Sequence, residues 1–223
     1  FLETERVDRL YATYRNPNSA LLAIAEPALQ CLPMDITEEA QIAAVVQKIQ
    51  SETAALHYVI NCVGWLHEGT QQPEKSLRQL NAEQLLRYFQ VNSIGAVLLA
   101  KQVQPLLKHP DRAILATISA KIGSIGDNAL GGWYGYRASK AALNMFMKTA
   151  AIEYQRTCPR AIVVTLHPGT TDTQLSRPFQ RNVPPEKLFS VERTVQQLLA
   201  VLDQLQEGDS GGFFSWDGSP LPW

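Results

Sequence analysis

Short apolar runs alternate along the chain with longer stretches whose apolar residues recur at helical spacing. The runs predicted to be strands cover residues 9–14, 28–32, 57–60, 113–118, 161–166 and 211–218. The run 113–118 reads Ala-Ile-Leu-Ala-Thr-Ile, with no regular polar alternation. Such a strand is covered on both faces, as strands of parallel sheets are. The pattern therefore predicts a parallel sheet buried between helices.

Helical spacing fills the intervals between these strands. Apolar residues at i, i+3, i+4 and i+7 predict a helix that packs one face on a sheet, and here they are Ile42, Val45, Val46 and Ile49. The tail of a helix is predicted at 1–7, and further helices at 81–107, 136–151 and 191–205. Strands that alternate with helices predict an α/β fold with a single doubly wound parallel sheet, Rossmann-like, in three α/β/α layers.

Size and charge narrow the class of protein. A chain of 223 residues with 45% apolar residues can bury one substantial core, so residues 1–223 are expected to form one domain. The formal net charge of -1 provides no basic stripe for nucleic acid and no polybasic patch for a membrane surface. No apolar run approaches the length of a bilayer span. We therefore expect neither nucleic acid nor a membrane as partner.

Cysteine and histidine are too few and too scattered to predict a disulfide framework or a metal site. The cysteines are Cys31, Cys62 and Cys158, and the histidines are His57, His67, His109 and His167. We expect no bound metal. Because unpaired thiols are typical of reducing compartments, we also expect a cytoplasmic location.

The strongest chemical signal is the sequence Tyr-Arg-Ala-Ser-Lys at 136–140. Positions four apart share one face of a helix, so Tyr136 and Lys140 can act on the same ligand. A nearby ammonium favours the phenolate and makes the phenol a better proton donor near neutral pH. The alternative is an exposed Tyr and Lys that merely share a helix surface. The strand 113–118 and a Gly-rich loop precede this helix, and ligands of such folds gather at the carboxyl ends of the strands.

The motifs around this pair resemble those of one enzyme family. Residues 123–128 read Gly-Ser-Ile-Gly-Asp-Asn, and residues 131–134 read Gly-Gly-Trp-Tyr. Together with 136–140 they resemble the short-chain dehydrogenase/reductase family, and within it the C-factor and sniffer-like carbonyl reductases, over essentially the whole chain. The resemblance implies hydride transfer between NADPH and a small aldehyde or ketone, with NADP(H) favoured over NAD(H). A C-factor-like signalling or dinucleotide-sensing protein with little turnover is the alternative.

The resemblance implies catalytic roles for particular residues. Tyr136 would protonate the carbonyl oxygen, and Lys140 would lower the pKa of Tyr136 and bind the nicotinamide ribose. Asn92 would bend its helix and, through its backbone carbonyl and a water, complete the proton path. The alternative for Asn92 is a side chain that is satisfied within its own helix.

The serine that holds the substrate carbonyl in this family has two candidates here. The family commonly places it three residues before a Gly, and counting back from Gly123 leads to Ala120. Ser119 lies one residue earlier, at the end of the strand 113–118, and is our prediction. Ser124 is the reserve. In a third interpretation neither serine touches the substrate.

Cofactor-binding residues are predicted at the ends of several strands. A cation at Arg15 suits the 2′-phosphate of NADP, although Arg15 can also be a solvated strand end. By resemblance, the Asp35 carboxylate and the Ile36 backbone would hold the adenine, although Asp35 can also simply begin the next helix. The other positions implied by the resemblance are Asn61, Cys62, Val63, Gly64, Tyr136, Lys140, Pro168, Gly169, Thr171 and Thr173. Cys62 replaces an Asn of the family and is expected to be a small buried filler.

Two further expectations concern the ends of the fold and its assembly. The fold normally begins with a strand and a Gly-rich phosphate-binding turn, but no Gly precedes Gly64, so we expect about two dozen residues of it ahead of Phe1. The resemblance also implies a homodimer or homotetramer formed through the outer faces of helices 81–107 and 136–151.

Residues 170–190 are predicted to form a substrate lid, because the segment is long, irregular and rich in Pro and apolar residues. Phe179, Leu188 and Phe189 favour a partly apolar substrate, with Trp133 as an opposite wall. The expected partner is therefore a small-molecule carbonyl or alcohol.

Overall fold

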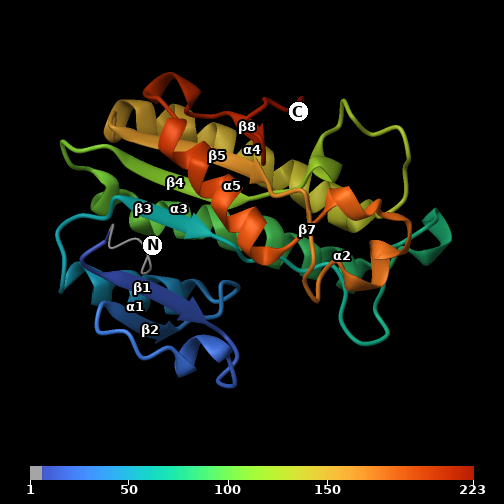
Figure 1. The fold of residues 1–223 in the computed structure, drawn as a ribbon, viewed down its shortest axis with the longest axis horizontal. Helices are drawn as coiled ribbons and strands as arrows, with labels where there is room; N and C mark the ends of the chain where they lie inside the picture. Colours follow the sequence, from blue (N-terminus) through green and yellow to red (C-terminus); the bar gives the residue numbers. More distant parts are fainter. Residues whose placement is uncertain (1–6) are drawn as a thin grey trace. The chain divides into compact units, whose positions relative to one another are not determined.

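A computed structural model describes residues 7–223, so the helix tail predicted at 1–7 falls almost wholly outside the described residues. Contacts divide the chain into two compact units, Phe1–Ala54 and Ala55–Trp223. Both are built from parallel strands and helices (Figure 1). The expectation of one domain over 1–223 stays a prediction.

The first unit contains a parallel strand pair and one helix. The strands β1 (Leu10–Tyr14) and β2 (Leu29–Pro33) pair with Leu10 opposite Leu29, and a 3₁₀ turn (Ala20–Ala23) lies between them in the chain. The helix α1 (Glu39–Gln50) follows β2, and its buried residues are Ile42, Val45, Val46 and Ile49. These are the positions whose spacing predicts the helix, so the prediction of its apolar face is confirmed.

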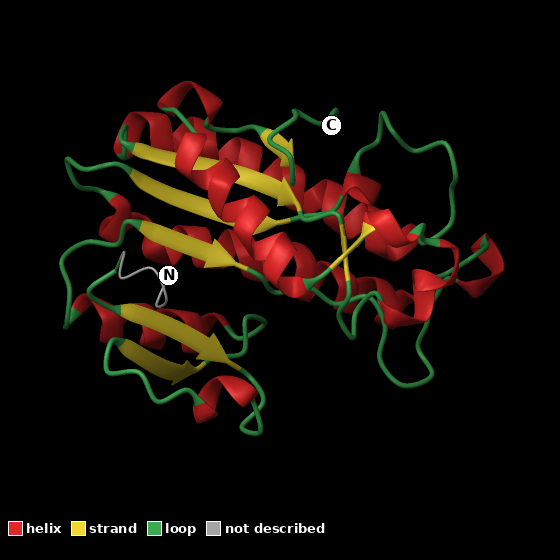
Figure 2. Cartoon of the chain, in the orientation of Figure 1, coloured by secondary structure: helices red, strands yellow, loops and turns green. Residues whose placement is uncertain are grey.

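The second unit is organised around a four-stranded parallel sheet with the order β3-β4-β5-β8 (Figure 2). The strands are β3 (Tyr58–Asn61), β4 (Ala113–Ile118), β5 (Ala161–His167) and β8 (Phe213–Ser215). The central strands β4 and β5 are almost completely buried, as their continuous apolar runs predict. The strand β3 is only half-buried, and within residues 7–223 its sheet neighbour is β4.

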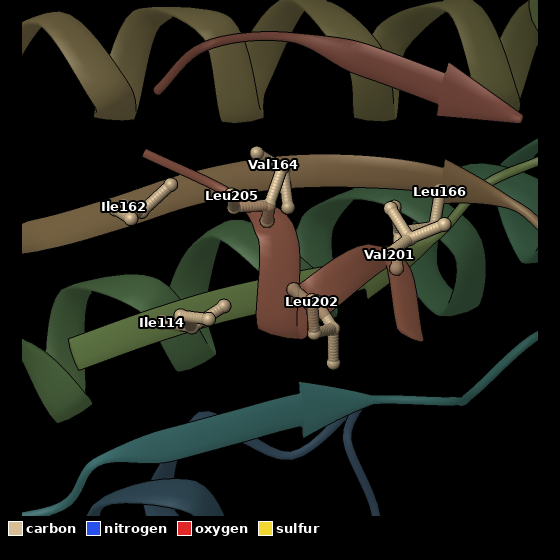
Figure 3. Packing of buried hydrophobic residues seen from close by; sticks show 8 residues of the cluster. Ile114, Ile162, Val164, Leu166, Val201, Leu202 and Leu205 are labelled. Atoms are coloured by element: carbon tan, nitrogen blue, oxygen red, sulfur yellow. The ribbon is translucent and has the colours of Figure 1, made fainter. Parts of the chain in front are cut away.

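Helices cover both faces of this sheet. On one face α5 (Val191–Gln204) packs on β4 and β5, and Figure 3 shows the aliphatic side chains that meet there: Ile114, Ile162, Val164, Leu166, Val201, Leu202 and Leu205. The opposite face carries α3 (Gly95–Val103) and α4 (Tyr134–Thr157), where the Thr117 hydroxyl donates to the Met147 sulfur at 3.6 Å. Alternate residues of β4 thus point to opposite layers. Each fully buried aliphatic side chain contributes about 1.5–3 kcal/mol to folding.

The stretch 81–107, predicted as helical throughout, is interrupted near its middle. It contains α2 (Ala82–Phe89), a π-helical turn (Gln90–Ile94), α3, and a 3₁₀ turn (Gln104–Leu107). Asn81 caps α2, since its side chain accepts a hydrogen bond from the Gln84 N–H at 3.1 Å. A π-helical turn bends a helix and is frequent at functional sites, and this turn contains Asn92.

The predicted lid segment 170–190 is bracketed by a short strand pair. The strands β6 (Thr170–Thr171) and β7 (Leu188–Phe189) pair in parallel, and two 3₁₀ turns (Arg177–Asn182 and Pro185–Lys187) lie between them. The segment therefore leaves the carboxyl end of β5 and returns to its starting point before α5 begins.

The prediction of an α/β fold with parallel strands is confirmed. The described strands pair as three separate sheets, β1-β2, β3-β4-β5-β8 and β6-β7, where one sheet is expected from the sequence. Between residues 7 and 223, no helix is long and apolar enough to span a bilayer.

Candidate active site

Tyr136 and Lys140 lie on successive turns of α4 and are both buried. Tyr136 is 6% exposed and Lys140 is 2% exposed. The Lys140 Nζ lies 5.9 Å from the centroid of the Tyr136 ring and donates a hydrogen bond to the Ile118 carbonyl, 3.0 Å away at the end of β4. The alternative of two exposed residues on a helix surface is therefore wrong. The pair sits at the carboxyl edge of the sheet of the second unit.

The start of α4 is held by a carboxylate from a distant loop. Trp133 precedes the helix with a left-handed φ of 53°, unusual for a large residue, and offers no side-chain cap. Glu74 takes over this function: its carbonyl accepts from the Trp133 N–H at 2.5 Å, and its Oε2 accepts from the Gly135 N–H at 3.2 Å. Glu74 is 1% exposed, so a buried carboxyl group lies at the positive end of α4.

Gly135 allows this arrangement because a side chain there would have no room. A Cβ at Gly135 would approach the Tyr88 ring to 2.4 Å. A similar restriction applies at Gly123 in the preceding loop, where a Cβ would lie 2.6 Å from the Lys140 Cβ. The close packing of Gly135 against Tyr88 and of Gly123 against Lys140 therefore fixes the first two turns of α4, which contain Tyr136 and Lys140.

Asn92 connects the π-helical turn to the end of β3 and to α4. Its Oδ1 accepts from the Trp65 N–H at 2.7 Å, and its Nδ2 donates to the Trp65 carbonyl at 2.9 Å and to the Ser139 hydroxyl at 3.0 Å. The alternative of an Asn satisfied within its own helix is therefore wrong. A π-helical turn contains Asn92, where the sequence predicts a bend, and the role of Asn92 in the proton path stays a prediction.

Gly64 lies directly beside the Lys140 ammonium and the Asn92 side-chain amide. A Cβ at Gly64 would lie 3.7 Å from the Lys140 Nζ and 3.9 Å from the Asn92 Oδ1. The preceding turn is held by Asn61, whose Oδ1 accepts from the Val63 N–H at 3.1 Å. Cys62 is exposed, so the prediction that it is a buried filler is wrong. The reason is its place in the turn after β3, beyond the part of the strand that the helices cover.

An aromatic and aliphatic cluster surrounds Tyr136. Its buried members are Trp65, Leu66, Tyr88, Val91 and Tyr136, and packed against them are Ala120, Ile122, Trp133, Leu175 and Phe179. The predicted lid contributes Phe179, whose ring centroid is 4.7 Å from that of Trp133. The His67 Nε2 lies 3.1 Å from the Leu175 carbonyl, which ties the lid to the loop after β3. The side chains around Tyr136 are therefore largely apolar, and of the lid residues expected to favour a partly apolar substrate the cluster contains Phe179.

The other aromatic residue of the lid, Phe189, faces elsewhere. Phe189 packs against Trp216 with ring centroids 4.9 Å apart, and the Arg193 guanidinium lies 3.8 Å from the centroid of the Phe189 ring. A Cβ at Gly169 would meet this same Phe189 ring at 2.5 Å. Phe189 therefore packs against the turn after β5 and is not part of the cluster around Tyr136.

Burial shifts the pKa values of the central pair in opposite directions. Desolvation, with a smaller contribution from Tyr88, raises the pKa of Tyr136 well above its usual range. Desolvation lowers the pKa of Lys140 to about 8. The sequence predicts a lowered pKa for Tyr136, but here burial outweighs the attraction of an ammonium that hydrogen-bonds to the Ile118 carbonyl. Tyr136 is accordingly a protonated donor at neutral pH.

Both candidate serines have partners within the protein. The Ser119 hydroxyl donates to the Asn144 Oδ1 at 2.7 Å and is 2% exposed. The Ser124 hydroxyl accepts from the Asp127 N–H at 3.1 Å, within its own turn. The residue that packs against the Tyr136 cluster is Ala120, because successive side chains at a strand end point in opposite directions. The role of Ser119 stays a prediction.

The turn after β5 contains the remaining predicted cofactor positions of this unit. Pro168 and Gly169 follow β5, and Gly169 has a φ of 74°, a conformation that favours glycine. The Thr171 hydroxyl lies 2.9 Å from the Thr194 hydroxyl of α5. The Thr173 carbonyl accepts from the Arg177 N–H at 3.0 Å and so begins the lid.

Arg15, Asp35 and Ile36 belong to the first unit. Arg15 is exposed directly after β1, and Ile36 is 4% exposed. The Asp35 carboxylate accepts from the Thr37 N–H at 2.9 Å and from the Thr37 hydroxyl at 2.7 Å, which orders the turn before α1. The helix α1 itself begins at Glu39 with Glu38 as its N-cap, and adenine binding by Asp35 stays a prediction.

Sequence reasoning missed Glu74 and Trp65. Glu74 lies in a polar loop 61 positions before Gly135, the residue whose N–H it binds, so no local spacing indicates its function. Trp65 directly follows Gly64, and its indole Nε1 is buried without a hydrogen-bond partner within the described part of the chain. A Trp immediately after the predicted cofactor turn is the signal that could have drawn attention to it.

The sequence also matches a known family over most of its length. Residues 7–184 match the family of short chain dehydrogenases. The chain therefore belongs to this family, whose members are NAD(P)-dependent oxidoreductases, and its fold is the Rossmann-like fold of the family.

Particular relatives are carbonyl reductases and a protein named C-signal. The carbonyl reductase Sniffer of Drosophila melanogaster is 27% identical, with a TM-score of 0.85 over 97% of this chain and 88% of that one. An NADPH-bound carbonyl reductase from chicken fatty liver is also 27% identical, with a TM-score of 0.84 over the same shares. The C-signal of Myxococcus xanthus is 30% identical over 149 residues, which are 66% of this chain and 84% of the relative.

Proposed function

We propose that the protein is an NADP-dependent short-chain reductase of small, partly apolar aldehydes or ketones. The observation that carries the proposal is the buried Tyr136–Lys140 pair, with the Lys140 Nζ 5.9 Å from the Tyr136 ring centroid and an aromatic wall around the phenol. A protonated phenol in an apolar site is suited to donate a proton to a carbonyl oxygen. The likeness to two carbonyl reductases supports the same reaction class.

The residues of the second unit fit a nicotinamide ribose next to Lys140. Gly64 provides a small-residue turn at the carboxyl end of β3, and a Cβ there would come within 3.7 Å of the Lys140 Nζ. The absence of a side chain at Gly64 lets a sugar reach the ammonium, which can donate to its hydroxyl groups. When bound, the cofactor supplies the hydride. The exposed cation Arg15 in the first unit supports NADP rather than NAD, because a cation suits a 2′-phosphate.

Tyr136 is the proton donor in this mechanism, and neighbouring residues stabilise its phenolate and hold its helix in position. As negative charge develops on the substrate oxygen, the Tyr136 O–H donates its proton, and the Lys140 ammonium stabilises the phenolate that remains. Asn92 is a positioning residue, since its amide connects Trp65 to Ser139 on α4. Glu74 is a second positioning residue, because its carboxylate holds the helix start that carries Tyr136.

In this mechanism Ser119 does not contact the substrate; its hydroxyl donates a hydrogen bond to the Asn144 side chain on α4. Its hydroxyl would reach a substrate oxygen only after leaving the Asn144 Oδ1, 2.7 Å away, whereas Ala120 packs against the Tyr136 cluster. We therefore assign Ser119 to the alignment of β4 with α4 and leave the carbonyl oxygen to Tyr136. Among residues 7–223 the Trp65 Nε1 in the same cluster has no hydrogen-bond acceptor, which favours substrates with a second polar group, such as diketones.

The test is NADPH oxidation with a panel of aldehydes, ketones and diketones. Wild-type turnover should fall by about a hundredfold or more in Tyr136→Phe, because a general acid contributes at least that much. Tyr134→Phe is the matched control, since this neighbouring tyrosine is 37% exposed, is not part of the cluster around Tyr136 and should tolerate the change. Turnover that survives in Tyr136→Phe would exclude Tyr136 as the proton donor.

A second candidate function is C-factor-like signalling or dinucleotide sensing with little turnover. Ala120 favours it, because the position that packs on the Tyr136 cluster carries no hydroxyl, and so does the likeness to the C-signal. Saturable NADPH binding measured by fluorescence, without turnover of any carbonyl in the panel, would favour this candidate. The retention of both Tyr136 and Lys140 supports the reductase.

The segment 170–190 is proposed as the substrate lid of this enzyme. Its support is the contact of Leu175 and Phe179 with the cluster around Tyr136, together with the β6-β7 pair that anchors both ends. A lid of this kind excludes water from the reacting atoms and sets substrate size.

A further inference from the structure

We propose that His57, His109 and Asp111 form a binding site for a divalent transition-metal ion, with Zn²⁺ as the ion that fits best. His57 directly precedes β3, and His109 and Asp111 lie just before β4. The site is therefore at the amino ends of these strands, the opposite edge of the sheet from Tyr136. The sequence predicts no metal because the two histidines are far apart in the chain, and the fold brings them together.

The three side chains converge on one small volume. One candidate ligand atom from each lies within 4.8 Å of the others. The His57 Nε2 is 3.8 Å from the Asp111 Oδ2, and the two imidazole centroids are 5.1 Å apart in an edge-on arrangement. The ligand atoms of a tetrahedral zinc ion lie about 3.3 Å apart, so side-chain movements of about 1 Å would complete the coordination.

The tautomer of His109 is the one that a metal ligand requires. Its Nε2 is 2.9 Å from the Leu56 carbonyl oxygen, which can only accept, so the Nε2 carries the hydrogen. The Nδ1 of the neutral ring then has a free lone pair. This Nδ1 is buried and has no hydrogen-bond partner among residues 7–223. Imidazole ligands typically donate their other N–H to a backbone carbonyl in this way.

Hydrogen bonds to backbone carbonyls fix the two loops that carry the ligands. The Leu56 N–H donates to the Leu106 carbonyl at 2.8 Å, and the Ile114 N–H donates to the His57 carbonyl at 2.8 Å. The Arg160 Nε donates to the Pro110 carbonyl at 3.1 Å, between the two ligands of the second loop. The ligand positions are thus defined by the fold before an ion arrives.

Two imidazoles and one carboxylate define the class of ion. Mg²⁺ and Ca²⁺ prefer all-oxygen sites, whereas zinc is commonly held by two His and one carboxylate with water in the fourth position. Because the ion would join the loops before β3 and β4, it would stabilise the folded chain, whose ligands separate on unfolding. The site is distant from the substrate cluster, so its role is structural or regulatory.

The test is zinc titration of the complete, untagged chain by calorimetry. Wild-type protein should bind one zinc ion per chain, and Co²⁺ in its place should give the intense visible absorption of a tetrahedral site. His57→Gln and Asp111→Asn should each weaken zinc binding by about tenfold or more. Both side chains are largely exposed, at 57% and 72%, so these variants should fold. His67→Gln, a histidine at the opposite edge of the sheet, is the matched control and should bind zinc normally.

Thermal unfolding gives an independent readout. Zinc should raise the Tm of the wild-type chain and of His67→Gln but leave that of Asp111→Asn unchanged. The proposal is overturned if the wild-type chain takes up no zinc, or if His57→Gln and Asp111→Asn bind zinc as tightly as wild type does.

Discussion

At the scale of single residues, the charge of Lys140 should control the pH dependence of the reaction. Burial lowers the pKa of Lys140 to about 8 and raises that of Tyr136, so both groups are protonated below this pH. Above it the ammonium loses its proton and no longer stabilises the developing phenolate. We expect kcat/KM for carbonyl reduction to be flat at lower pH and to fall as pH rises through about 8.

A pH profile of wild type and Lys140→Arg checks this. Arginine remains charged throughout this pH range. The kcat/KM of Lys140→Arg should therefore fall at a higher pH than that of the wild type, or should not fall at all. A wild-type kcat/KM that increases as pH rises through this range would contradict the assignment.

Two single variants, Ala120→Ser and Ser119→Ala, provide a second test at the level of single residues. Ala120→Ser would place a hydroxyl beside the Tyr136 cluster and should raise kcat by about tenfold, since a well-placed donor to a developing oxyanion is worth at least that. Ser119→Ala should reduce kcat far less than Tyr136→Phe, because the Ser119 hydroxyl binds Asn144. Steady-state kinetics of the two variants decide the matter. A large loss of kcat in Ser119→Ala, with unchanged Tm, would restore Ser119 as the carbonyl-binding residue.

Local spacing and long-range packing explain what the sequence could predict about the site. Tyr136 and Lys140 share a helix face, and that follows from positions four apart. The direction of Ser119 could not be predicted, because whether a strand-end side chain points toward Tyr136 or Asn144 depends on where the strand stops. The function of Glu74 could not be predicted for a different reason. Its partner is the backbone N–H of Gly135, and a bond to a backbone group leaves no residue pattern in the sequence.

At the scale of elements, Glu74 should govern the stability of the start of α4. Glu74→Ala leaves the buried Gly135 N–H without an acceptor and should lower the free energy of unfolding by about 1–2 kcal/mol. Glu74→Gln keeps an acceptor oxygen and should cost less. Urea unfolding of the three proteins measures both effects.

The same variants connect this helix start to activity. If Glu74 positions Tyr136, Glu74→Ala should lower kcat more than KM changes, and Glu74→Gln should recover part of kcat. Glu83→Ala, an exposed acidic residue in the first turn of α2, is the control. Equal effects of Glu74→Ala and Glu83→Ala on stability would rule out a special function of Glu74.

Periodicity predicted whole elements better than their interruptions. The apolar spacing of α1 and the continuous runs of β4 and β5 are dictated by burial and were therefore predictable. The π-helical turn at Gln90–Ile94 was not, since it changes the register of a helix without changing its composition. The polar Asn92 in a helical stretch indicated a special feature there, because a buried polar residue requires hydrogen-bond partners.

At the scale of the whole molecule, the sequence predicted the parallel α/β class but not the division of the strands into sheets. An apolar run indicates a strand, whereas its neighbours are chosen by contacts between residues far apart in the chain. Nothing within the run 57–60 indicates that β4 is the strand that pairs with it in the described part of the sheet.

The outer face of α4 should form a contact between copies of the chain. Met145 and Ile152 lie seven positions apart, on one face of the helix, and are 66% and 51% exposed. Exposed apolar side chains in such a row favour pairing with the same face of a second copy, as in a two-fold symmetric dimer. We expect the wild-type chain to be a homodimer or homotetramer by light scattering coupled to size-exclusion chromatography.

The double variant Met145→Glu/Ile152→Glu should shift this oligomer to the monomer, because symmetry would bring like charges together across the interface. Leu130→Glu is the matched control: Leu130 is 93% exposed in the loop before α4 and should leave the oligomer intact. Far-UV circular dichroism of all three proteins separates dissociation from unfolding. An unchanged oligomer in the double variant would place the interface elsewhere, whereas a monomeric wild type would remove the expectation of an oligomer altogether.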